Sequence, residues 1–206
     1  HREVAMQPIH VMGSVAPAWQ PSLTPEERNR RTIYTYRQRN RGFPQLEAFN
    51  LPGSDASCER RDQTTVTPQA FTLLNSESSL SRALAMAKRL TEFSSDPTKQ
   101  IHRAFVLAYH RPPTSEQLER SLAHLKKMTE YHQSHPPQAK KPPKQIARHM
   151  VEEMTGEEFS WTEPLDVYAS KDYVSDVKPW QVDAATRALA ELCLVLMNSN
   201  EFLHVY

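Results

Sequence analysis

The sequence has few glycines, and this scarcity excludes several classes of enzyme. Its 206 residues contain only four glycines, at widely separated positions: Gly13, Gly42, Gly53 and Gly156. The G-x-G-x-x-G fingerprint, the P-loop and the G-x-S-x-G elbow each need clustered glycines, because the backbone must turn sharply or approach a ligand closely. We therefore predict no dinucleotide-binding fingerprint, no P-loop and no nucleophile elbow in this chain.

Cysteine is equally scarce, with only Cys58 and Cys193. Without a C-x-x-C pair the chain has no cysteine zinc cluster, no thioredoxin-like motif and no C-x-x-C-H haem attachment. Cys193 lies on the apolar face of an expected helix, so a buried thiol is the default interpretation. The alternative is a disulfide between Cys58 and Cys193, which would require an oxidising compartment. A reactive thiol at Cys58, beside Arg60 and Arg61, is the weaker hypothesis, because no histidine is close in sequence.

The chain also lacks an excess of charge, a long apolar run and a metal-binding motif. The 25 Lys and Arg against 24 Asp and Glu give a net charge of +1, which predicts no nucleic-acid partner. No run approaches the ~20 apolar residues that span a bilayer, so we predict no membrane span. The nine histidines include no H-E-x-x-H pair; we interpret His132 and His135 as a surface pair and predict no metal site.

Helix signals fill most of the rest, so the predicted fold class is mainly α. Apolar residues recur at helical spacing, as in Leu80–Phe93, and helix-capping residues precede the expected segments: Thr24, Thr67, Asp96, Thr114 and Asp183. We predict an irregular bundle of about six helices, with the apolar helix ending at Met197 at its centre. A long ordered coil over 42–66 and at most a short β-hairpin complete it.

Two segments carry ambiguous or short helix signals, and composition indicates the domain boundaries. Ile33–Tyr36 suits either a short strand or a helix, whereas Ile146–Met154 is predicted to be a short helix that Gly156 stops. We predict an extended arm over 1–23 and a single helical domain over 24–206, with an exposed Pro/Lys-rich insertion at 134–144. The chain begins at His1 without a leader-like segment, and we expect it to be a fragment of a larger multidomain protein.

The most site-like cluster surrounds Arg60 and Arg61, just before a helix start at Thr67-Pro68. With Glu47 and Asn75, these guanidiniums could bind a carboxylate, phosphate or sulfate through charge-assisted hydrogen bonds. Alternatively, the arginines pair internally with nearby carboxylates and pin the coil, because a long irregular segment needs side chains to satisfy its backbone. We favour the pinning role.

Two further polar segments need an interpretation. Arginines recur over Arg28–Arg41, interleaved with Tyr34 and Tyr36. An RNA-binding strip is conceivable, but we favour buried arginine stacking on tyrosine, or an interface with an upstream domain. Asn198–Phe202 is predicted to be a helix exit, where polar side chains bond the last carbonyls.

Three stretches carry a family resemblance: 30–50, 57–76 and 188–205, with the motifs R-R-x-I-Y, S-C-x-R-R, T-P-Q-A and N-S-N-E-F. They resemble the C-terminal part of a planctomycete secreted family of unknown function, which is commonly joined to planctomycete-type cytochrome c modules. The resemblance implies a bacterial envelope protein, periplasmic or extracellular. Haem would belong only to upstream domains, so no cofactor is expected in this fragment.

No reaction follows from these observations. The leading hypothesis is a non-catalytic docking or structural module, whose partners are the upstream domains or another envelope protein. The alternative is an accessory part of an enzyme site that binds an acidic or sulfated carbohydrate through Arg60, Arg61, Glu47 and Asn75. The sequence does not decide whether the whole protein is an enzyme, but we favour no catalytic role for this fragment alone.

Overall fold

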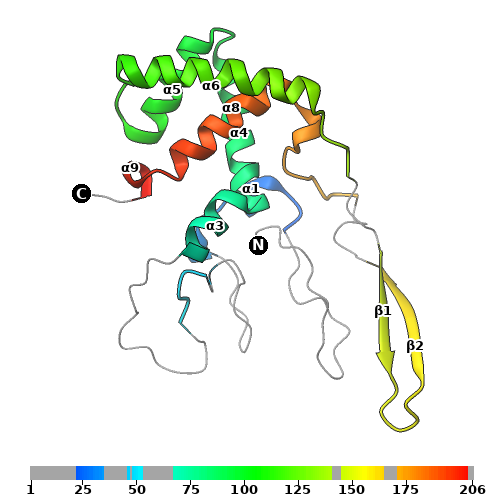
Figure 1. Cartoon of the computed structure of the whole chain (residues 1–206). Helices are drawn as coiled ribbons and strands as arrows, with labels where there is room; N and C mark the ends of the chain where they lie inside the picture. The colour runs from blue at the N-terminus through cyan, green and yellow to red at the C-terminus, as the bar shows by residue number, and fades with distance from the viewer. Residues whose placement is uncertain are drawn as a thin grey trace. The chain divides into compact units, whose positions relative to one another are not determined.

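The computed structural model describes residues 22–34, 46, 48–52, 67–140, 145–164 and 171–203 (Figure 1). It confirms a mainly α fold with one short antiparallel hairpin. Contacts divide the chain into two compact units. Unit 1 comprises His1–Tyr36 and Ala139–Asp176, and unit 2 comprises Arg37–Gln138 and Val177–Tyr206. Compactness alone does not show that a unit folds independently, so the predicted domain boundaries stay a prediction.

Unit 2 is helical over the residues that the structure describes. Its elements are α3 (Thr67–Asn75), α4 (Glu77–Phe93), α5 (Pro97–Tyr109), α6 (Ser115–Ser134), the 3₁₀ helix η2 (Pro179–Gln181), α8 (Ala184–Met197) and α9 (Asn200–Leu203). Most of the predicted helices are found here. Residues 135–140, which follow α6, have no regular structure, and the rest of the expected 134–144 insertion lies outside the described residues.

The predicted capping residues set the helix starts. The Asp96 side chain accepts from the Thr98 amide at 2.9 Å, and Asp183 accepts from the Thr186 amide at 2.7 Å. At α6 the capping box is reciprocal, because Thr114 and Gln117 each bond the other's backbone. Each bond satisfies an amide that has no partner within the helix, which is why these residues fix the start of a helix.

The core of unit 2 lies where α8 packs against α4, α5 and α6. This arrangement confirms the expectation that the most apolar helix is central. Small residues on α4 and α8 let the two helices approach closely, while the larger aliphatic side chains fill the space around them. The buried set is Ala83, Leu84, Ala87, Leu90, Ile101, Ala104, Phe105, Leu125, Ala188, Leu189, Ala190, Leu192, Cys193 and Leu196. Burial of this apolar area is the main stabilising contribution.

Unit 1 contains α1 (Pro25–Arg28), the 3₁₀ helix η1 (Thr32–Tyr34) and the hairpin of β1 (Gln145–Val151) and β2 (Glu158–Pro164). The prediction of a helix over 146–154 is therefore wrong. Apolar residues at 146, 150 and 154 fit the spacing of a helix, but positions four apart also share one face of a strand. Gly156, at φ +72°, turns the hairpin instead of ending a helix, and its amide donates to the Glu152 carbonyl at 2.8 Å.

Arg28 joins the two chain segments of unit 1 and is 1 % exposed. Its guanidinium donates to the carbonyls of Ser22 and Val174, at 2.6 and 2.5 Å, and contacts the Asp176 carboxylate at 3.4 Å. It also lies over the Tyr173 ring, 5.3 Å from the ring centroid. One arginine predicted for the Arg/Tyr run is therefore buried against a tyrosine, although that tyrosine comes from far along the chain.

Among the described residues, no helix is long and apolar enough to cross a membrane. The extended arm over 1–23 and the coil over 42–66 lie almost entirely outside the described residues, so both stay predictions.

Candidate functional site

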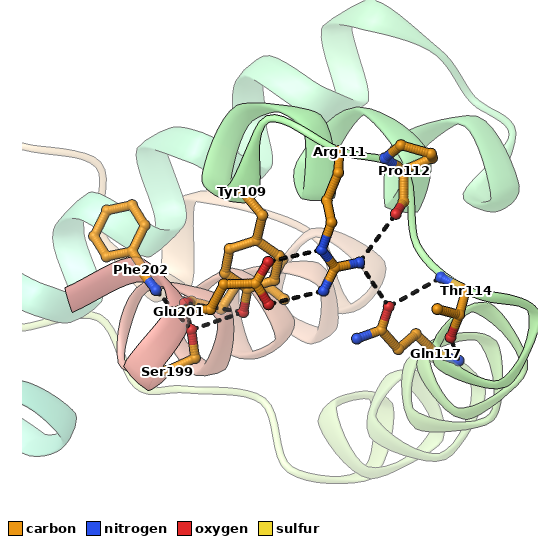
Figure 2. A network of polar contacts seen from close by, with 9 residues as sticks. Tyr109, Arg111, Pro112, Thr114, Gln117, Ser199, Glu201 and Phe202 are labelled. Carbon is orange, nitrogen blue, oxygen red and sulfur yellow. Dashed lines mark hydrogen bonds and ion pairs between the residues drawn. The ribbon is translucent and has the colours of Figure 1, made fainter. Parts of the chain in front are cut away.

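An extended polar cluster surrounds Arg111, directly after α5 (Figure 2). Helix α5 ends because His110 adopts a left-handed conformation, with φ 57°, and two prolines follow Arg111. This turn directs the guanidinium towards α9. Nε donates to Oε1 of Glu201 at 2.7 Å, and Nη2 donates to Oε2 at 2.8 Å. The two parallel bonds make a bidentate pair, the most directional form of arginine–carboxylate contact.

The third nitrogen of Arg111 faces the start of α6. Nη1 donates to the Pro112 carbonyl and to Oε1 of Gln117, both at 3.1 Å. Gln117 Oε1 also accepts from the Thr114 amide at 2.9 Å, as the other half of the capping box. The arginine therefore links the start of α6 to α9.

Tyr109 adds a second connection to the same place. Its hydroxyl lies 2.8 Å from the Ser199 Oγ and 3.3 Å from the Leu196 carbonyl, which is near the end of α8. The Phe202 amide in turn donates to Ser199 Oγ at 3.2 Å. The Arg111 guanidinium lies over the Tyr109 ring, 5.4 Å from its centroid. Figure 2 shows the tyrosine and the arginine converging on the α9 segment.

The same segment caps α8, as the sequence predicted. The Asn198 side chain donates to the Leu194 carbonyl at 2.7 Å, and Ser199 Oγ donates to the Leu196 carbonyl at 2.8 Å. These bonds add a side-chain donor to carbonyls of the last turn, which also accept from the Asn198 and Ser199 amides. Three polar residues of the N-S-N-E-F motif, Asn198, Ser199 and Glu201, thus bond to the fold itself.

Electrostatics keep the Arg111–Glu201 pair ionised. The hydrogen bonds from Arg111 hold the pKa of the Glu201 carboxyl below its usual value, and the same bonds raise the pKa of Arg111. Both side chains are partly open to solvent, so screening weakens the attraction. With four of the five guanidinium N–H donors already bonded internally, this cluster can position α9 but has little capacity left for an anion.

A second polar cluster lies between α6 and α8. His132 Nε2 lies 2.9 Å from Glu191 Oε1, and Arg187 donates to the His132 carbonyl at 3.0 Å. His124 Nε2 lies 3.9 Å from Glu191 Oε2 and is buried without a hydrogen-bond partner. His132 is thus mostly covered rather than on the surface as predicted, while His135 is exposed and stacks on Tyr131. Within the described ranges, no three His, Cys, Asp or Glu side chains are placed to hold a metal.

The predicted anion site cannot be assembled from the described residues. Arg60, Arg61 and Glu47 lie outside them, and Asn75 is exposed at the end of α3. The anion site and its alternative, the internally pinned coil, therefore both stay predictions. Cys193 is a free, fully buried thiol on α8, as the sequence suggested. Its disulfide with Cys58 stays a prediction, because Cys58 also lies outside the described residues.

No local sequence pattern predicts the Arg111 cluster. Arg111 and Glu201 are 90 residues apart, so neither lies within a motif that contains the other. The one clue was that each stands beside a recognisable helix end. Arginines at such ends can bond free carbonyls or capping side chains, but the partner can be chosen only when the helices are packed.

The fold and this cluster define a class: a mainly α protein whose main described polar network is bonded internally and holds helix ends together. The model of the PSD1 family, described as "Protein of unknown function (DUF1553)", matches residues 5–125, more than half of the chain. The chain belongs to this family. No curated protein and no solved structure matches it. The match includes Tyr109, Arg111 and Gln117 but ends before α8 and α9.

Proposed function

We propose that this chain is a non-catalytic helical docking or structural module of a large exported multidomain protein. The observation that carries the proposal is the exposure of the segment after α1. Ile33 is 78 % exposed and Tyr34 70 % exposed, and Arg30 and Arg31 beside them are exposed as well. Adjacent exposed apolar residues with arginine neighbours have the composition that protein interfaces favour.

The internally bonded arginines also support a structural rather than a catalytic role. Arg28, Arg111 and Arg187 all donate to carbonyls or side chains of this chain. Side chains bonded in this way stabilise helix ends and contacts between distant segments, and few of their donors remain to bind a substrate. The contribution of this module to its parent protein would then be shape and contact surface.

The proposal also covers the parent protein and its place in the cell. The resemblance of the 30–50, 57–76 and 188–205 stretches supports a planctomycete envelope protein, periplasmic or extracellular, with cytochrome c modules elsewhere in the parent chain. Its partners would be upstream domains of the same polypeptide or another envelope protein. We propose no cofactor in this segment, since any haem would be carried by those other domains.

Site-specific crosslinking tests the docking role. We would place p-benzoylphenylalanine at position 34 of the full-length protein in its native host, irradiate, and identify the crosslinked peptides by mass spectrometry. The matched control carries the same probe in place of Glu119, an exposed residue of α6. Docking predicts crosslinks from position 34 to a defined protein segment and few from position 119. Equally sparse labelling from both positions would refute the docking role.

A further inference from the structure

One face of the hairpin in unit 1 carries two aromatic rings and a methionine beside Arg148. In the register of β1 and β2, Met150 lies opposite Phe159, and Arg148 lies opposite Trp161. Side chains alternate between the two faces of a strand, so these residues share one face. The rings of Phe159 and Trp161 stack with their centroids 5.5 Å apart. Phe159 nevertheless remains 48 % exposed.

No described element covers this face. Among the elements that the structure describes, each strand packs substantially only against the other. An isolated two-stranded hairpin is marginally stable in water, and exposed aromatic side chains add to that cost. A partner that buries Phe159 and its neighbours would remove both penalties.

The turn of the hairpin is acidic. Four glutamates lie within seven residues, Glu152, Glu153, Glu157 and Glu158, and they surround Met154, which is 91 % exposed. The Glu152 carboxylate accepts from the Thr155 amide at 2.6 Å, and its hydrogen bonds with Thr155 lower the pKa of Glu152. The turn is therefore anionic at neutral pH, and a fitting partner has apolar side chains beside positive charges.

The same chain carries a segment of that description. The residues after α1 place two exposed guanidiniums, Arg30 and Arg31, next to the exposed side chains of Ile33 and Tyr34. The hairpin and this segment are alike in apolar character and opposite in charge. Such complementarity favours the correct pairing and speeds its formation.

We infer that the β1–β2 hairpin of one copy docks on the Arg30–Tyr34 segment of a second copy. A two-fold dimer makes this contact twice, because each copy contributes one hairpin and one segment. The inference rests on the proposed docking function and names the partner of its exposed segment. In the dimer, Phe159, Met154, Ile33 and Tyr34 become buried, while the glutamates of the turn face the two arginines at the rim.

A charge exchange between copies tests the inference directly. One variant combines Glu153→Lys with Glu157→Lys, and the other combines Arg30→Glu with Arg31→Glu. Each alone brings like charges together at both contacts, so we expect its dimer Kd to rise about tenfold or more. Mixed in equal amounts, the two variants restore opposite charges at both contacts and should form a heterodimer. Sedimentation velocity over about a hundredfold range of concentration measures each state.

Controls separate loss of fold from loss of contact. Circular dichroism should be the same for both variants, because all four substituted residues are exposed. A second pair on α6, Glu116→Lys with Glu119→Lys, changes the net charge equally and should leave the dimer intact. Added salt should weaken the native dimer, since the rim contacts are ionic.

The outcomes also separate this inference from the docking proposal. A native chain that stays monomeric, or variants whose mixture stays monomeric, would overturn the second-copy inference. Crosslinks from position 34 to a different protein would then still support docking. Crosslinks from position 34 to the 145–164 peptide, together with rescue in the mixture, are the results that we expect.

Discussion

Cys193 should be chemically silent in the folded protein, although it is a free thiol. It is fully buried on α8, and burial raises the pKa of the thiol from 9.0 to about 12. The thiolate is the reactive form, and an apolar surrounding disfavours it. The variant Cys58→Ser leaves Cys193 as the only thiol of the chain, so labelling reports on this position alone.

The expected size of the effect follows from that pKa. At about pH 8, a thiol with a pKa of 9.0 is about 10 % ionised, whereas one with a pKa of about 12 is about 0.01 % ionised. The thiolate population therefore falls about a thousandfold, before the exclusion of the reagent is counted. Labelling of the folded protein should proceed only through opening of the core around α8.

The assay follows reaction of Cys58→Ser with iodoacetamide as urea is increased. We expect almost no modification below the unfolding transition and complete modification above it, with the double variant Cys58→Ser, Cys193→Ser as the control for reaction at residues other than cysteine. Modification of the folded protein at the rate of a free cysteine peptide would refute the burial argument.

The same experiment on the native sequence tests the proposed disulfide. If Cys58 and Cys193 are joined, the unfolded, unreduced chain will show no reactive thiol, and peptide mapping will recover the linked pair. If they are separate, two thiols will react after unfolding. Because a buried thiol is the default interpretation of Cys193, we expect two.

Two further predictions concern ionised side chains at helix ends. Arg111→Gln should raise the pKa of the Glu201 carboxyl towards its usual value, as NMR titration would show, whereas Arg120→Gln should not; equal effects would contradict the bidentate pair. Because the pKa of Glu201 is lowered in the fold, the stability that it contributes is present above its unfolded pKa and is lost as pH falls through the folded value. Asp183→Ala should lower the free energy of unfolding by about 1 kcal/mol in urea titration, through loss of the cap on Thr186, and Asp183→Asn by less. The hydrogen bond with Thr186 also lowers the pKa of Asp183. Protonation of Asp183 in acid should therefore weaken the cap, so the difference in unfolding free energy between Asp183→Ala and the native chain should become smaller. A difference that does not change with pH would contradict a charged cap.

The helices of unit 2 were predictable because their signals are local. Asp96, Thr114 and Asp183 each stand one residue before a helix and bond an amide two or three residues further on. The hairpin was not predictable in this way. The spacing of Ile146 and Met150 fits a helix as well as a strand. The segment forms a strand because it pairs with Glu158–Pro164.

The same distinction between local and distant contacts applies to the candidate site. The sequence indicated that Asn198 and Ser199 would bond the end of α8, since helix ends leave carbonyls that nearby side chains can reach. It could not indicate that Arg111 bonds Glu201 or that Arg28 lies over Tyr173, because these partners come from distant parts of the chain.

By itself, then, the sequence determined the helical class, most helix starts in unit 2 and the burial of Cys193, because capping and apolar spacing act over one or two turns of chain. Only the tertiary structure decided which carbonyls and carboxylates Arg28 and Arg111 bond, and that residues 145–164 pair as strands. Those outcomes depend on contacts between segments far apart in sequence, whose geometry exists only after the chain has packed.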